Sequence, residues 1–181
     1  MEKQVIIDRT WIIFGSLLIP INLVCLIGSG ITRNPYELLW ISHYSGLLGG
    51  IVLILRFKKP FFNGVYSFLF IFQLGSVLTH LINPLPHETY LDVFYWLNHV
   101  PHIIGFYVII KKKITSQGVN VGFIFLLFMM ALTAQILYVY GVEDLGINTL
   151  FRGYFLLNLA LSVGWYIILL LIERKTSREL K

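Results

Sequence analysis

Long apolar stretches separated by short polar connections dominate the pattern of this chain. Six of the stretches contain about 20 mostly apolar residues, which is the length of a helix that crosses a membrane. They are residues 10–31, 37–57, 61–82, 91–110, 121–142 and 151–172. Because the connections are short, they leave no room for a separate soluble domain. The pattern predicts an all-α integral membrane protein, a single domain over residues 1–181 built as a bundle of six transmembrane helices.

The composition excludes several other classes of protein. Hydrophobic residues make up 57% of the chain and charged residues 13%, and the mean hydropathy is +0.78. Soluble domains carry about 25% charged residues. The chain is therefore not expected to be a soluble globular domain, a disordered tail or a nucleic-acid-binding module. A single cysteine, Cys25, also excludes a disulfide framework and a thiolate metal site.

The basic residues set the expected orientation. Lys and Arg accumulate in the cytoplasmic loops of membrane proteins. With the N-terminus in the cytoplasm, only Arg33 and Arg152 of the 14 basic residues fall on the outer side. The inner ones are Lys3, Arg9, Arg56, Lys58, Lys59, Lys111, Lys112, Lys113, Arg174, Lys175, Arg178 and Lys181. This bias predicts a multi-pass cell-membrane protein with both termini cytoplasmic, and it explains the basic clusters without nucleic acid or anionic lipid.

Two local features of the first two segments predict close helix packing. Ser42, Gly46 and Gly50 follow one another at intervals of four residues, so they share a helix face. Small residues allow helix backbones to approach closely in lipid. Pro20 in the first segment is expected to bend the helix or to leave a carbonyl group for a neighbouring polar group, and packing is favoured over function for both Pro20 and Asn22.

The five histidines are the main candidates for chemistry. On the expected topology His43, His80, His87, His99 and His102 all lie in the outer half of the membrane or in the outer loop. Ionisable residues inside a membrane are costly, and they usually face the bundle interior or a water-filled cavity. The histidines therefore predict a polar cavity that opens to the extracytoplasmic side.

The fourth segment carries the densest polar pattern. Asp92, Tyr95, His99 and His102 are spaced three, four and three residues apart, so they form one stripe on a helix. Asn98 lies at the edge of this stripe. Pro101 removes a backbone donor between the two deep histidines and frees a carbonyl group. Such a helix suits a cavity wall better than a lipid-facing surface.

The leading hypothesis is a membrane-embedded enzyme, a hydrolase or an acyl or group transferase, that acts on a lipid or lipid-linked substrate in the outer leaflet. Histidine can act as a general base, and an acidic group can orient it. The candidate catalytic residues are His99, His102, Asp92, His43 and His80. The candidate substrate-binding residues are Tyr95, Asn98, Gln135, Arg152, Asn158, His87 and Glu88. No nucleophile is identified by a motif.

A metal site is the second hypothesis. Neutral imidazole is a common metal ligand, and His99 and His102 at i, i+3 can both reach one ion. His43 or His80 would be the third protein ligand of zinc or another divalent metal, which would assist a hydrolase. Haem-based electron transfer across the membrane is disfavoured because no histidine lies in the inner half.

Two alternatives need no enzyme. Six spans in about 180 residues match the size of a small-solute-binding membrane subunit of a transporter, and the solute would enter from outside past His87, Glu88 and Arg152. A structural or immunity-type membrane protein, whose polar residues only specify helix packing, is the other. The expected partners are membrane lipid and a small or lipid-linked substrate. The oligomeric state is left open.

Overall fold

Apart from the turns at residues 55–59 and 112–115, the part of the chain that the structure describes is helical. The structure, a computed structural model, describes residues 2–32, 41–82, 103–140 and 147–179, and no strand occurs among them. The helices are α1 (Glu2–Thr32), α2 (Ile41–Ile54), α3 (Pro60–Ile82), α5 (Ile104–Lys111), α6 (Ser116–Tyr140) and α7 (Ile147–Glu179). The predicted all-α class is confirmed for these residues.

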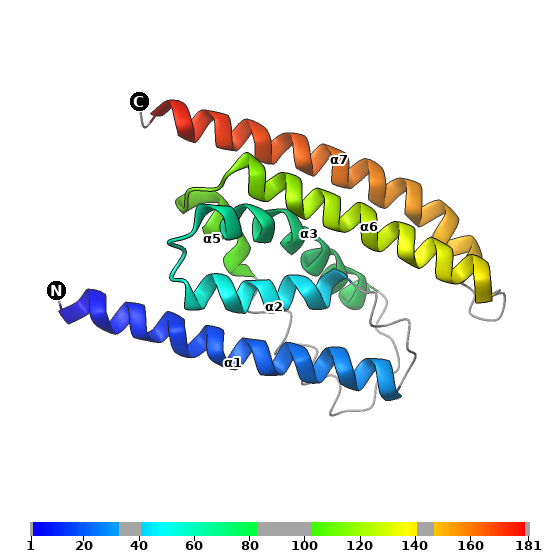
Figure 1. Cartoon of the computed structure of the whole chain (residues 1–181), viewed down its shortest axis with the longest axis horizontal. Coiled ribbons are helices and arrows are strands. Elements are labelled where there is room, and N and C mark those ends of the chain that lie inside the picture. Colours follow the sequence, from blue (N-terminus) through cyan, green and yellow to red (C-terminus); the bar gives the residue numbers. More distant parts are fainter. Residues whose placement is uncertain (1, 33–40, 83–102, 141–146, 180–181) are drawn as a thin grey trace.

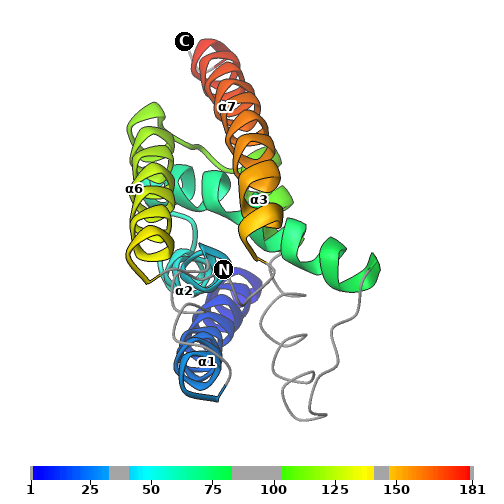
Figure 2. The same ribbon diagram turned by 90° about the vertical axis from the view of Figure 1, so that its right-hand side faces the viewer.

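Successive helices alternate in direction. The start of α1, the α2–α3 turn, the α5–α6 turn and the end of α7 all lie at the left in Figure 1. The end of α1, the start of α2, the ends of α3 and α6 and the start of α7 lie at the right, which we call the far end. Figure 2 shows α1 and α2 on one side of the molecule and α7 on the opposite side. Both ends of the chain therefore approach the same end of the bundle.

Two helices extend well past the predicted apolar stretches. The first stretch begins at residue 10, whereas α1 begins at Glu2, and α7 continues to Glu179 beyond residue 172. Lys, Arg, Glu and Gln are good helix formers, so a helix need not end where its apolar residues end. The apolar pattern predicted the places of α1, α2, α3, α6 and α7, but it could not give their polar extensions. The second stretch was predicted to continue to residue 57, whereas α2 ends at Ile54, and residues 91–102 of the fourth stretch lie outside the described residues.

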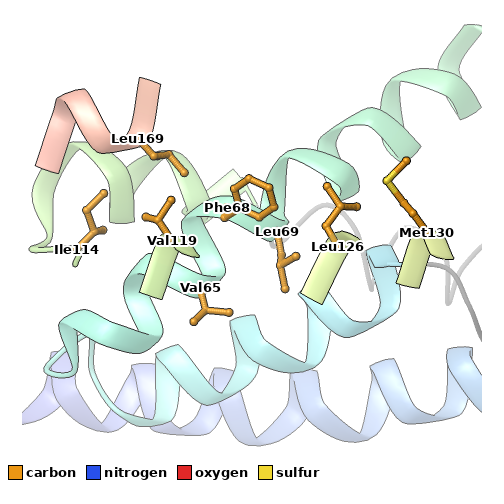
Figure 3. Packing of buried hydrophobic residues seen from close by; sticks show 8 residues of the cluster. All are labelled: Val65, Phe68, Leu69, Ile114, Val119, Leu126, Met130 and Leu169. Carbon is orange, nitrogen blue, oxygen red and sulfur yellow. The ribbon is translucent and has the colours of Figure 1, made fainter. Parts of the chain in front are cut away.

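The central element is α3. Every residue from position 63 to position 70 of α3 is buried, so this part of the helix is covered on all sides. Its Phe68 and Leu69 join a cluster completed by α6, α7 and Ile114 (Figure 3). Its Tyr66 and Phe70 join a second cluster, with Leu18 of α1, Val52, Leu53 and Phe57 around the end of α2, and Val108 of α5. Through these two clusters α3 connects the two sides of the bundle.

Glycines allow two helix pairs to meet backbone to backbone. A Cβ atom on Gly50 of α2 would lie 3.1 Å from the carbonyl oxygen of Gly15 on α1. A Cβ atom on Gly64 of α3 would lie 3.1 Å from the Cα atom of Gly118 on α6. Such approaches leave no room for a larger residue. The close packing that the small residues of the second segment predict is confirmed at Gly50, and also at Gly46, where a Cβ atom would overlap Asn22 of α1.

The end of α2 is a Schellman motif without glycine. Phe57 N–H donates to Val52 O over 3.1 Å, and Arg56 N–H donates to Leu53 O over 2.8 Å. Arg56 and Phe57 both have left-handed backbone angles, with φ of 53° and 58°. Since this conformation is costly for residues with a Cβ atom, other contacts must stabilise the turn. Phe57 and Val52, both buried, supply the usual apolar contact of the motif.

The turn before α6 is fixed by side-chain hydrogen bonds. Thr115 caps the helix because its Oγ1 accepts a hydrogen bond from Gly118 N–H over 3.2 Å. The buried amide of Asn63, near the start of α3, donates to two carbonyl oxygens, Phe57 O and Lys113 O, each over 2.9 Å. One side chain therefore holds the α2–α3 turn beside the α5–α6 turn.

Large apolar side chains cover much of the outer surface. Examples are Phe14 on α1, Ile110 on α5, Phe128 on α6 and Leu171 on α7, which are 56%, 71%, 61% and 58% exposed. Exposed apolar areas of this extent are unusual on soluble monomers. In the described part of the chain, α1 has one segment, Ile6–Gly28, that is long and apolar enough to cross a membrane.

Candidate functional site

The far end of the bundle holds the two described helix positions that carry candidate catalytic histidines. His43 lies in the first turn of α2 and His80 in the last turn of α3. Since α2 and α3 pack against each other in opposite directions, these two positions lie at the same end of neighbouring helices (Figure 1). The side chains of both residues are outside what the structure describes, so their contacts stay predictions.

Three candidate binding residues also lie toward the far end. Gln135 belongs to the last turns of α6, and its side chain is exposed. Arg152 and Asn158 lie about 8 and 16 Å along α7 from its first residue, at a rise of 1.5 Å per residue. The structure thus brings five of the candidate positions to the far half of the bundle, on α2, α3, α6 and α7.

The polar stripe of the fourth predicted segment lies outside the described residues. The same holds for the predicted outer loop. The candidates concerned are His87, Glu88, Asp92, Tyr95, Asn98, His99 and His102. Their arrangement around Pro101, and the cavity that they predict, therefore stay predictions from the sequence.

A metal centre has no described ligand set. Among the residues that the structure describes, no group of three or more His, Cys, Asp or Glu side chains could hold an ion. The predicted ligands His99 and His102 belong to the undescribed segment, and the side chain of His43 is not described either. The zinc hypothesis is therefore untested by this geometry.

Buried polar groups occur inside the bundle at the described helix contacts. Asn22 of α1 is fully buried, and its amide donates to Leu18 O over 2.8 Å. Within the described residues its Oδ1 atom and the Oγ atoms of Ser45 and Ser67 have no hydrogen-bond partner. The Asn22 oxygen lies against Gly46 of α2, where a Cβ atom would overlap it. These groups identify polar positions within otherwise apolar interfaces.

The end opposite the histidines is rich in exposed cations, and we call it the basic end. Its exposed basic side chains are Arg9, Lys58, Lys59, Lys111, Lys113, Arg174 and Lys175. Arg56 is different, because its guanidinium donates to Asp8 Oδ2 over 2.9 Å and so joins the α2–α3 turn to α1. This ion pair is one of the contacts that hold the turn of Arg56 against α1.

An aromatic cluster lies beside this ion pair. The Lys112 ammonium lies 5.2 Å from the ring centres of both Phe57 and Tyr107. The ring of Trp11 meets Phe57 edge to face at 5.5 Å and stacks on Tyr107 at 6.5 Å. Cation–π contacts of this kind stabilise an ammonium group that is partly removed from water. The cluster joins α1, the α2–α3 turn and α5.

Sequence reasoning did not find this arrangement at the basic end. It counted Arg56 and Lys112 only as charges that set the orientation, and it assigned no role to Asn63. The left-handed turn that places Phe57 against Trp11 has no glycine or asparagine to reveal it. The available signal was Asn63 itself, a polar residue in the first turn of an apolar segment. That segment begins directly after Lys58 and Lys59.

Comparisons with family models, with curated proteins and with solved structures find no match to this chain. Over residues 2–32, 41–82, 103–140 and 147–179, the observations define an all-helical protein with one helix that is apolar and long enough to cross a membrane. Any finer statement about its function depends on the chain's own residues.

Proposed function

We propose that this chain is a six-span membrane protein with a histidine-lined polar site at its far end, and that this site is the active site of an enzyme acting on a lipid or lipid-linked substrate. The observation that supports the proposal is that basic residues and candidate histidines lie at opposite ends of the bundle. Exposed Lys and Arg gather at the basic end, whereas the helix ends that bear His43 and His80 gather at the far end. The two ends therefore differ in chemistry.

Helix length supports the membrane part of the proposal. α3, α6 and α7 contain 23, 25 and 33 residues. At 1.5 Å per residue these helices are about 35, 38 and 50 Å long, and the hydrocarbon core of a bilayer is about 30 Å thick. The exposed apolar side chains of α1, α6 and α7 favour contact with acyl chains.

The basic end indicates the orientation. Cytoplasmic loops carry the excess of Lys and Arg, so the basic end faces the cytoplasm and the far end faces outward. The proposed site is then open to the outer leaflet or to the extracytoplasmic solution. A lipid headgroup is the substrate feature that reaches this level without leaving the membrane.

The proposed chemistry uses histidine as a proton-transfer group. His99 and His102 act as general base and acid toward water or a substrate hydroxyl. Asp92 lies about 10 Å from His99 along a helix, so it orients the imidazole through Tyr95 or a bridging water. Arg152, near the start of α7, binds a phosphate or carboxylate of the headgroup by charge-assisted hydrogen bonds. His43 and His80, which lie on α2 and α3 toward the same end of the bundle, complete the polar lining.

The test compares the full chain with a His99→Gln/His102→Gln variant. Both are reconstituted into vesicles of a total polar lipid extract, and lipid species are quantified by mass spectrometry over time. Wild type is expected to consume one lipid class and form its product. The variant is expected to be at least about 100-fold slower while keeping the helical circular dichroism of wild type. Gln117→Ala, an exposed substitution at the basic end, is the matched control and should keep full activity.

Two results would contradict the enzyme proposal. One is an unchanged lipid profile with wild type, and the other is equal turnover by the histidine variant. A water-soluble compound that co-purifies with wild type and is lost from the variant would favour the transport-subunit alternative instead. Metal content and the visible spectrum of the same two samples test the zinc hypothesis, because a bound metal should be lost with the two histidines.

A further inference from the structure

Two lysine-rich turns lie side by side at the basic end. Asn63 donates to Phe57 O and to Lys113 O over 2.9 Å each, so the two oxygen atoms are no more than twice that distance apart. Asn63 is 1% exposed, which makes this bridge a buried part of the fold. Lys58 and Lys59 directly follow Phe57, and Lys111 and Lys112 directly precede Lys113. The fold therefore concentrates five lysines from two distant parts of the chain.

Of these five lysines, Lys112 makes described contacts with other side chains of the fold. Lys112 lies over the rings of Phe57 and Tyr107. The four others, Lys58, Lys59, Lys111 and Lys113, are exposed, and we call them the lysine ledge. Within the described residues, none of the four is close enough to a carboxylate to form a salt bridge, since the ion pair found there joins Arg56 to Asp8.

Apolar side chains border the lysine ledge. Ile110, next to Lys111, is 71% exposed, and Phe61, two residues after Lys59, is 39% exposed. Cationic groups at the ends of apolar helices, with exposed apolar side chains directly beside them, match the two parts of a phospholipid. The ammonium groups suit the headgroup phosphate, and the apolar side chains suit the acyl chains.

We infer that the lysine ledge binds the headgroups of anionic phospholipids in the leaflet at the basic end. This inference rests on the membrane part of the proposed function and is independent of the histidine chemistry. Orientation in the membrane does not account for the arrangement, because the orientation rule counts charges in each loop and needs no contact between loops. A buried asparagine that fixes two lysine turns together instead concentrates positive charge at one place, as a binding surface requires.

The experiment measures lipid preference directly. The full chain is reconstituted into phosphatidylcholine vesicles with trace spin-labelled phosphatidylglycerol or spin-labelled phosphatidylcholine. Electron spin resonance then gives the fraction of each lipid held at the protein surface. For wild type we expect an association constant for phosphatidylglycerol at least about fivefold above that for phosphatidylcholine. The excess should decrease as salt is raised.

Matched double variants locate the effect. Lys58→Gln/Lys111→Gln removes one ledge lysine from each turn, and Arg174→Gln/Lys175→Gln removes two exposed cations from the end of α7. The ledge variant should lose most of the preference and the α7 variant should keep it. Lys58→Arg/Lys111→Arg, which keeps the charge, should also keep it.

Two outcomes would overturn the inference: no phosphatidylglycerol preference in wild type, or equal losses in the ledge and α7 variants. Resistance of the reconstituted chain to carbonate extraction is measured on the same vesicles. If the chain resists extraction but shows no ledge-dependent preference, the lipid site is wrong and the membrane proposal stands. If carbonate removes wild type from the vesicles, the membrane proposal itself fails.

Discussion

The two sides of the bundle hold their helices together in different ways. On one side, α1 meets α2, and in the centre α3 meets α6, through glycines that bring the backbones into contact. On the other side, α7 is attached to its neighbours by side chains. Trp165 donates to Ser67 O of α3 over 3.0 Å, and Tyr166 stacks on Phe123 of α6 at 4.8 Å. A Cβ atom on Gly164 of α7 would have no neighbour within 4 Å among the residues that the structure describes.

This difference has a consequence for the candidate site. Backbone contacts fix the relative position of two helices closely, whereas contacts between long side chains tolerate small shifts. His43 and His80 lie on the helices that glycines hold, and Arg152 and Asn158 lie on α7. Of the candidate residues, His43 and His80 therefore have the more rigid support, and the proposed headgroup-binding Arg152 has the more adaptable one. Substitutions along the two kinds of contact test this distinction.

The largest effect is expected at the α3–α6 contact, from Gly118→Leu. A Cβ atom at this position would overlap the carbonyl oxygen of Phe61, and backbone cannot move aside as a flexible side chain does. We expect destabilisation by about 4 kcal/mol or more, or no folded protein at all. Thermal unfolding in detergent, followed by circular dichroism, measures it. A variant with wild-type stability would show that α3 and α6 do not meet at Gly118.

A substitution at the α1–α2 contact should lower the stability by a smaller amount, and a second substitution should recover part of the loss. A Cβ atom on Gly46 would overlap the Asn22 side chain, so Gly46→Ala should destabilise the protein by about 2 kcal/mol. In an Asn22→Ala background the same change should cost about 1 kcal/mol less, because the obstructing amide is gone. Unfolding of the four proteins of this double-mutant cycle gives the coupling. Strict additivity would mean that the two residues do not touch.

Loss of one side-chain contact of α7 should lower the stability less than either glycine substitution. Trp165→Phe keeps an aromatic ring beside Phe70 but loses the hydrogen bond to Ser67 O. We expect a loss of about 1 kcal/mol, the usual net value of one hydrogen bond. Tyr166→Phe, which removes an exposed bond of 2.8 Å to Asn120, is the matched control and should cost less than Trp165→Phe. The reverse order in the unfolding measurements would contradict this account of α7.

The sequence predicted which helix faces pack closely better than it predicted which helices they pack against. Four-residue spacing on α2 indicated close packing, and Gly46 and Gly50 do lie against α1. That α1 is the partner did not follow, because periodicity gives the face of a helix but not its neighbour. Gly64 and Gly118 were missed, since their contact joins two elements far apart in the chain. The histidine positions on α2 and α3 reach one end of the bundle because the helices alternate, which the lengths of the apolar stretches already implied.

The smallest effect is expected on the outer face of α7, from Gly164→Ala. A methyl group there would meet no described residue within 4 Å, and alanine favours a helix over glycine by up to about 1 kcal/mol. The variant should therefore be as stable as wild type or slightly more stable. Gly105→Ala is the informative contrast, because its methyl group would overlap the ring of Phe70 and should destabilise the protein. If Gly164→Ala is instead as harmful as Gly105→Ala in the same detergent, the outer face of α7 must be packed against another chain. In that case, the difference between helices that meet through glycines and α7, which is attached by side chains, would describe only a single copy of the protein.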